Sequence, residues 1–158
     1  MITATAKIPL KVGGSWPDKT FSTLRVGDKI SFYKENLAGR EISLRAGNNE
    51  VWLDNGNING DQWTIETANN GDAKAVSFSK TNSAGTKCFA RHAGYVLWCH
   101  PSATDAVYKA DSSFWVSPAP AGNGKGLAFE SVNYPGFFIN AGANNLRVAI
   151  RQDTSADS

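Results

Sequence analysis

The sequence predicts an all-β protein built from an internal repeat, and two observations carry this prediction. The first is a pattern that occurs three times: an aliphatic residue, any residue, Phe, three residues, Asn, two residues and Gly. Its phenylalanines, Phe32, Phe78 and Phe129, lie 46 and 51 residues apart, a period typical of one supersecondary unit used repeatedly. The second is that no segment has a convincing helical period of apolar residues, whereas Gly, Asn and β-branched residues occur throughout.

Each copy of the pattern predicts a strand followed by a tight turn. The aliphatic residue and the Phe are two positions apart, so both side chains face one side of a strand. Asn and Gly follow, and both tolerate the positive φ angles that turns require. We therefore expect the three phenylalanines to lie in the core, together with Trp63 and Phe114, which occupy matching positions further along the first two repeats.

Short strand-like runs, separated by clusters of Gly, Asn, Asp and Ser, fill each repeat. The repeats span about 30–68, 76–119 and 127–158. The predicted strands are 30–35, 41–46, 50–54 and 62–67, then 76–80, 87–92, 95–99 and 113–118, and finally 127–132, 137–140 and 146–150.

Three units of four strands predict a β-trefoil, a six-stranded barrel capped by three hairpins. The third repeat stops before its fourth strand, which would leave unpaired backbone groups at the edge of the barrel. Two apolar runs near the N-terminus, 6–12 and 20–26, have no repeat partner. We expect 6–12 to supply the missing strand, beside the first strand of the third repeat, because 20–26 leads directly into the first repeat. Pro9 within it suits an edge or a strand start.

Length and composition favour one domain, and the absence of catalytic motifs favours binding over catalysis. The chain has 158 residues, a net charge of +2 and no basic run longer than two residues, which argues against a nucleic-acid partner. No window is long and apolar enough for a transmembrane helix. The N-terminus lacks the apolar segment of a signal peptide, which leaves three alternatives open: the cytosol, export by another route, and a mature or recombinant form of the protein. No catalytic or phosphate-binding motif occurs, so we expect no enzyme activity and no cofactor.

The two cysteines flank a predicted hairpin. A two-residue turn at Ala93-Gly94 would place Cys88 opposite Cys99, within disulfide range. A disulfide is plausible in an oxidising compartment, and two free thiols are the alternative. With His92 and His100 nearby, zinc must also be considered, but in this hairpin the four side chains would not converge tetrahedrally, so we predict no metal site.

Parts of the chain resemble a known family. The segments GLAFESVNYPGFFIN (126–140), LRV (146–148) and DTSADS (153–158) resemble the arabinose-binding domain of α-L-arabinofuranosidase B, carbohydrate-binding module family 42. The second repeat is similar through CFARH (88–92) and ADSSF (110–114), and the first mainly through the shared spacing and GDQW (60–63). The resemblance covers roughly residues 30–158 and implies a β-trefoil.

It also implies an arabinose pocket in each repeat, formed by an aromatic residue and a His of the second strand and an Asp before the fourth. The second repeat matches best, with Phe89 at the aromatic position, His92 at the His and Asp111 at the Asp. The alternatives are structural: His92 as a hairpin surface residue, and Asp111 as a turn cap.

The other two repeats match the pocket less well. The third has Phe138 and Asp157, but Ala141 occupies the position of the His. The first has Asp61, which could equally cap a turn, with Arg45 nearest the position of the His and no matching aromatic residue. We therefore expect unequal sites.

The residue types fit a polyol ligand independently of the family. A carboxylate accepts hydrogen bonds from two hydroxyls, a His donates or accepts, and an aromatic face covers the C–H side of a sugar ring. One such site gives about millimolar affinity, roughly 4 kcal/mol, and repeated sites gain avidity on a polyvalent glycan. We expect a lectin-like protein whose partner is a glycan or polysaccharide.

The alternative is a protein–protein module, such as a protease inhibitor or the receptor-binding component of a toxin. Such a module would act through long exposed loops, of which 117–126 and 11–19 are the best candidates. Trp52 and Trp98, in the third strands of their repeats, are expected to be partly exposed.

Overall fold

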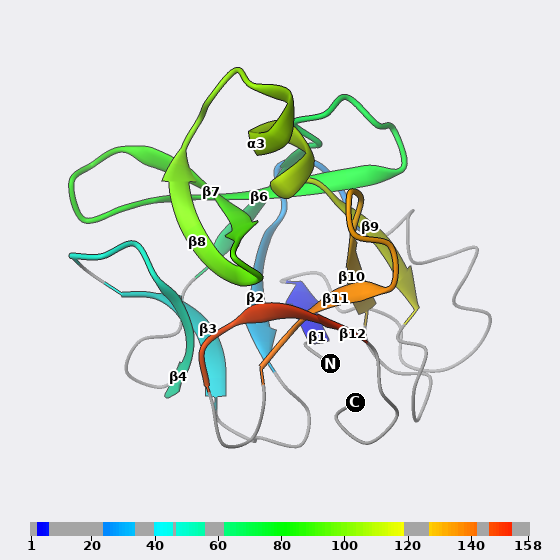
Figure 1. Ribbon diagram of the computed structural model, residues 1–158. Coiled ribbons are helices and arrows are strands. Elements are labelled where there is room, and N and C mark those ends of the chain that lie inside the picture. The colour runs from blue at the N-terminus through cyan, green and yellow to red at the C-terminus, as the bar shows by residue number, and fades with distance from the viewer. Residues whose placement is uncertain are drawn as a thin grey trace.

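The computed structural model describes residues 3–6, 24–33, 40–45, 47–55, 62–118, 127–141 and 146–152 (Figure 1). This part of the chain consists mainly of β-strands, which belong to one hydrogen-bonded sheet. The prediction of an all-β protein is confirmed, and each predicted strand overlaps an observed one. The strands are β1 (Thr3–Ala6), β2 (Lys29–Tyr33), β3 (Arg40–Leu44), β4 (Val51–Asn55), β5 (Trp63–Thr67), β6 (Ala75–Thr81), β7 (Lys87–Ala93), β8 (Val96–Pro101), β9 (Phe114–Pro118), β10 (Leu127–Ser131), β11 (Phe137–Asn140) and β12 (Ala149–Gln152).

A short helix, α3 (Ala106–Asp111), corrects the expectation that no segment is helical. Its N-cap is Asp105, whose Oδ1 accepts a hydrogen bond from the backbone N–H of Tyr108 at 2.7 Å. Six residues are too few to show an amphipathic period, so the pattern of apolar residues could not reveal this helix. Its position matters because α3 packs against β7 and ends at Asp111.

The strands form two kinds of pairing, all antiparallel. Strands β1, β2, β5, β6, β9 and β10 pair in that order, and β1 also lies close to β10. The remaining strands form three hairpins, β3–β4, β7–β8 and β11–β12. Figure 1 shows these hairpins converging around one end of the first group of strands.

The three hairpins meet around Val51, Leu97 and Val148, which are at most 2% exposed. Backbone hydrogen bonds link them in cyclic order, since each hairpin donates an N–H to a carbonyl of the next. These bonds run from Cys99 to Asn49 (2.9 Å), from Ile150 to Tyr95 (2.7 Å) and from Leu53 to Leu146 (2.8 Å). Asn49, Tyr95 and Leu146 therefore occupy matching positions in their hairpins.

The core is centred on the phenylalanines of the repeated pattern. The rings of Phe32, Phe78 and Phe129 contact one another edge to face, with centroids 5.0–5.3 Å apart. None of the three is more than 3% exposed, and Trp63 and Phe114 are equally buried. The predicted core residues are confirmed, and each edge-to-face contact adds about 0.5–1.5 kcal/mol beyond the burial of apolar area.

An N-terminal strand is present, but it begins three residues earlier than predicted, at Thr3. β1 pairs with β2 in a register that sets Thr3 opposite Tyr33 and Ala6 opposite Ile30. Of the predicted segment 6–12, only Ala6 lies within the described residues, so a strand over 7–12 stays a prediction. The candidate loop 11–19 and most of 117–126 also lie outside the described residues.

Cys88 and Cys99 form a disulfide in hairpin β7–β8, with Cα atoms 5.3 Å apart and both side chains fully buried. The predicted register of this hairpin is wrong by one residue on each strand. Ala93 pairs with Val96, so the turn is Gly94-Tyr95, with φ of 59° and 67°. Two positive φ angles define a type I′ turn, which matches the twist of a hairpin. Cys99 consequently lies opposite Ala90, and the disulfide bridges the strands diagonally.

Candidate functional site

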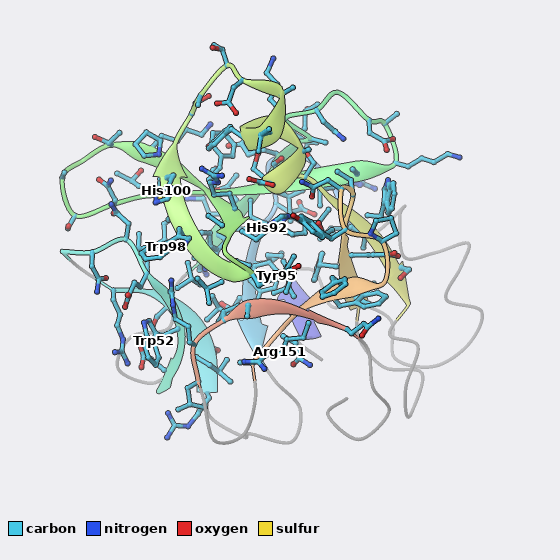
Figure 2. All side chains as sticks on the ribbon, in the orientation of Figure 1. Trp52, His92, Tyr95, Trp98, His100 and Arg151 are labelled. Atoms are coloured by element: carbon cyan, nitrogen blue, oxygen red, sulfur yellow. A yellow bond between two sulfur atoms is a disulfide. The ribbon has the colours of Figure 1, made fainter. Side chains whose placement is uncertain are left out.

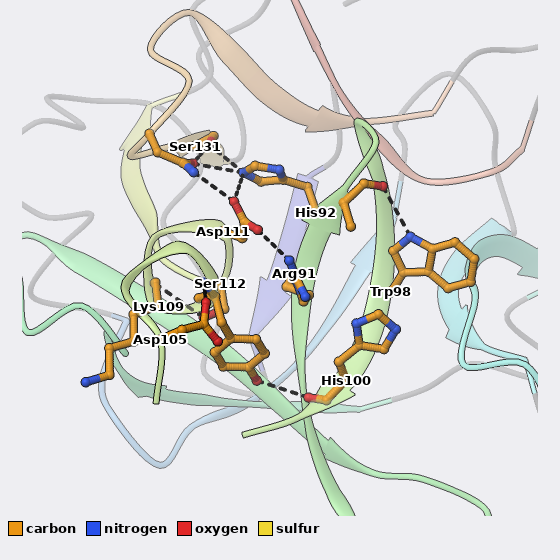
Figure 3. Close-up of polar contacts among 12 residues, drawn as sticks. Arg91, His92, Trp98, His100, Asp105, Lys109, Asp111, Ser112 and Ser131 are labelled. Atoms are coloured by element: carbon orange, nitrogen blue, oxygen red, sulfur yellow. Dashed lines mark hydrogen bonds and ion pairs between the residues drawn. The ribbon is translucent and has the colours of Figure 1, made fainter. Parts of the chain in front are cut away.

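His92 and Asp111, predicted from the second repeat, lie together. His92 is near the end of β7 and Asp111 is the last residue of α3, which packs against β7. The His92 Nε2 atom is 3.5 Å from Asp111 Oδ1 (Figure 3), and the two residues are only 3% and 5% exposed. Neither is a hairpin surface residue.

The last residue of β10 and the turn that follows it supply the other half of this cluster. His92 Nε2 is 3.0 Å from Ser131 Oγ and 2.9 Å from Asn133 Oδ1, and Asn133 Nδ2 donates to Asp111 Oδ1 at 2.8 Å. Amide and carboxylate oxygens can only accept, so this network assigns the proton of the neutral imidazole to Nε2. Ser131 in turn donates its hydroxyl to Asn133 Oδ1 at 2.8 Å.

Arg91 fixes the second oxygen of the carboxylate. Its Nη2 atom is 2.5 Å from Asp111 Oδ2, and this ion pair is largely buried. The Arg91 guanidinium also lies 5.3 Å from the ring centroid of Tyr108, on α3. Asp111 therefore accepts from Arg91 on one oxygen and from Asn133 on the other, which holds the carboxylate in one orientation.

The environment keeps His92 neutral. Burial disfavours the imidazolium and lowers the pKa of His92 below its usual 6.5, although the hydrogen bond with Asn133 and the charge of Asp111 oppose this shift. Burial likewise lowers the pKa of His100 on β8. The cluster thus offers a neutral N–H donor beside a carboxylate at neutral pH.

The exposed members of the cluster are Asn133 and Tyr134. The Tyr134 ring is 41% exposed and contacts the His92 ring edge to face, with centroids 5.2 Å apart. Hydrogen-bond donors and acceptors next to an aromatic ring are the combination that a small polyol requires.

The structure does not bring the other predicted residues to this cluster. Phe89 is 9% exposed and lies three residues from His92 on β7, which places the two side chains on opposite faces of the strand. Phe138 is partly buried on β11, opposite Glu130 on one side and Arg151 on the other. Asp61 and Asp157 lie outside the described residues.

In the first repeat, Leu44 occupies the position of the His, because it pairs with Val51 as His92 pairs with Leu97. The expected residue, Arg45, is one position further along the chain. Arg45 forms an ion pair with Asp54, with Nη2 and Oδ1 3.0 Å apart, and its guanidinium lies 4.0 Å above the Trp52 ring. Trp52 and Trp98 are both partly exposed, as predicted. In the third repeat, Ala141 is fully buried.

Sequence reasoning missed Ser131, Asn133 and Arg91. Asn133 belongs to the repeated pattern, which predicts a turn residue there and no contact with His92, and Ser131 lies two residues before it in segment 126–140. Arg91 lies between Phe89 and His92, which are both expected in the site, but no spacing rule indicates a role for Arg91 itself. The contact of Ser131 with His92 spans 39 residues of sequence, beyond any local signal.

Within the described part of the chain, no group of three or more His, Cys, Asp and Glu side chains could hold a metal ion. Among the same residues, no helix is long and apolar enough to cross a membrane.

Comparisons with known proteins point to one family. The model of the family described as "Alpha-L-arabinofuranosidase B (ABFB) domain" matches residues 57–158. No curated protein matches the chain. Similar solved structures include a GH54 α-L-arabinofuranosidase soaked with a cyclic sulfate inhibitor, at 18% identity, and an arabinofuranosidase complexed with arabinofuranosyl-α-1,2-xylobiose, at 17% identity. Each similarity has a TM-score of 0.65 and covers 93% of this chain but only 30% of the other chain. At this identity the likeness shows a shared fold.

Proposed function

The chain belongs to the α-L-arabinofuranosidase B (AbfB) domain family, and on this premise we propose that it is a non-catalytic carbohydrate-binding module. Its ligand is an arabinose-type side chain of a glycan or polysaccharide. The family match supports the class of ligand, and the cluster of His92, Asp111 and Asn133 supports the location of the site.

We further propose that the fold is a single β-trefoil domain of three four-stranded repeats. Strands β1, β2, β5, β6, β9 and β10 would form the barrel, and the three hairpins would cap it. The cyclic hydrogen bonds between hairpins and the packing of three equivalent phenylalanines support this threefold arrangement.

The hydrogen bonds of Asn133 carry the proposed binding mode. Its amide donates to Asp111 Oδ1 and accepts from the Nε2–H of His92, which is the pair of interactions that two neighbouring sugar hydroxyls would make. Asn133 is exposed, whereas the groups it contacts are buried. An incoming sugar would therefore displace the amide, donate one hydroxyl to Asp111 and accept a hydrogen bond from His92, with Tyr134 against its ring.

The repeats would contribute unequally. The first repeat has Leu44 at the position of the His, and the third has the fully buried Ala141 there, so neither can make the hydrogen bonds of His92. The nearby Arg45 guanidinium is engaged by Asp54 and Trp52. We propose that the second repeat is the principal site. Phe89, Phe138, Asp61 and Asp157 stay predictions from the resemblance.

The test is a binding titration with methyl α-L-arabinofuranoside and with arabinoxylan. Replacing His92 by Ala or Asp111 by Asn should weaken binding about 10- to 100-fold, the equivalent of a charge-assisted hydrogen bond of roughly 1.5–3 kcal/mol. Asp54→Asn is the matched control, because it breaks the Arg45–Asp54 ion pair of the first repeat without touching the cluster. Circular dichroism establishes that each variant is folded.

Two results would contradict the proposal. One is that the unaltered protein binds no arabinose-containing glycan at millimolar concentration. The other is that folded His92 and Asp111 variants bind as tightly as the Asp54→Asn control. Release of arabinose from either ligand would contradict the non-catalytic assignment.

A further inference from the structure

Three aromatic rings form a compact exposed patch beside the proposed site. Tyr95 comes from the turn between β7 and β8, whereas Tyr134 and Phe137 come from the β10–β11 turn and the start of β11. Their ring centroids are 5.6–6.1 Å apart in all three pairs. Tyr95 is 51% exposed and Tyr134 is 41% exposed. Figure 2 shows Tyr95 at the tip of hairpin β7–β8, where it approaches β11 and β12.

Tyr95 occupies a backbone conformation that disfavours tyrosine. Its φ is 67°, in the left-handed region, where Gly or Asn is usual and a bulky side chain is strained. The matching position of hairpin β3–β4 holds Asn49, with φ 58°. An Asn at position 95 would serve the turn better, so the turn does not explain the aromatic ring. Strain kept at an exposed position indicates a role for that side chain.

The patch is continuous with the proposed sugar site. Tyr134 contacts Phe137 and Tyr95 as well as the His92 ring, so it belongs to both. Among the described residues, no cationic side chain lies over any of the three rings, whereas cations do cover Trp52 and Trp98. The ring faces thus suit the uncharged C–H face of a pyranose.

We propose that Tyr95, Tyr134 and Phe137 form a second subsite, which binds the sugar ring that carries the arabinose held at His92 and Asp111. This inference rests on the proposed function and extends it: the ligand is a branched oligosaccharide of an uncharged polysaccharide, and the module distinguishes the attached side chain from free arabinose.

The experiment compares methyl α-L-arabinofuranoside with arabinofuranosyl-α-1,2-xylobiose by calorimetric or NMR titration. The unaltered protein should bind the trisaccharide roughly tenfold more tightly, since stacking on aromatic rings adds a favourable contact. Tyr95→Asn, which installs the residue of the matching turn position, should abolish that difference and leave the affinity for the methyl arabinoside within about twofold. Tyr95→Phe keeps the ring and should keep the difference.

Each contrary outcome identifies what fails. Equal affinities of the unaltered protein for the two sugars would overturn the second subsite and leave the proposed function standing. Binding of neither sugar would overturn both. A tenfold difference that survives Tyr95→Asn would remove Tyr95 from the subsite and overturn the inference. Self-association in sedimentation experiments that Tyr95→Asn abolishes would assign the patch to a second copy of the chain instead.

Discussion

A single imidazole, that of His92, links three segments of the chain. It contacts Asp111 at the end of α3, Ser131 at the end of β10 and Asn133 in the β10–β11 turn. Because its surroundings supply acceptors for one N–H but little solvent, the neutral ring is favoured over the imidazolium. The same network serves stability and, in our proposal, ligand binding.

Stability should therefore depend on pH below the ordinary pKa of histidine. The pKa of His92 is lowered in the folded protein, so the unfolded chain takes up a proton first as the pH falls through about 6.5. The neutral ring therefore stabilises the folded protein fully above this pH. This stabilisation is lost progressively as the pH falls below it towards the lowered pKa of His92. His92→Gln should flatten the decrease in stability between pH 7 and pH 5, measured by urea unfolding.

His100→Gln is the comparison variant: burial lowers the pKa of His100 as well, so removing this ring should flatten the decrease by its own share without disturbing the network of His92. The lowered pKa values of Asp54 and Glu66 affect stability only near and below about pH 4.5, outside this window. An unchanged dependence between pH 7 and pH 5 in His92→Gln would show that the folded protein tolerates a charged His92.

At the scale of elements, hairpin β7–β8 contributes most to the site. It carries His92 and Arg91 on one strand and the tip residue Tyr95, and its disulfide lies inside the core. The type I′ turn follows His92 in the chain, and Cys88 of the Cys88–Cys99 bond precedes it. Both constrain the hairpin and so limit the movement of His92 relative to α3.

Removing the disulfide should lower the free energy of unfolding. For the short loop that it closes, the loss is about 3 kcal/mol in the chain-entropy model. The double variant Cys88→Ala, Cys99→Ala tests this by chemical unfolding, with the reduced unaltered protein as its counterpart. Because both sulfurs are fully buried, a mild reductant should not cleave the bond in the native protein. Two thiols titrated in the unreduced, denatured protein would contradict the disulfide itself.

At the scale of the whole molecule, the N-terminal strand joins the start of the chain to segments far along it. β1 pairs with β2 and lies close to β10, more than 120 residues away in sequence. Without β1, the edge of β2 that pairs with it would present unpaired backbone groups, which favours association with other chains.

Deleting residues 1–6 should therefore lower stability by roughly 2–4 kcal/mol, from the loss of a few backbone hydrogen bonds of about 1 kcal/mol each. Thermal unfolding and sedimentation measure the two consequences, a lower melting temperature and association of chains. A Gly-Ser hexapeptide in place of residues 1–6 keeps the length but weakens the strand, so it should give an intermediate effect. A truncated protein that melts at the original temperature and stays monomeric would show that β1 does not close the edge.

The sequence alone determined the strands, the central phenylalanines and the partners of the disulfide, because alternation and turn residues are local signals. Tertiary structure decided the rest. The register of β7–β8 depended on which two residues adopt positive φ, and helix α3 was too short for a period. The contact between Asp111 and Asn133 joins residues 22 apart, and that between His92 and Ser131 joins residues 39 apart. Only folding brings such groups together, since hydrogen bonding between distant segments leaves no periodic trace in the chain.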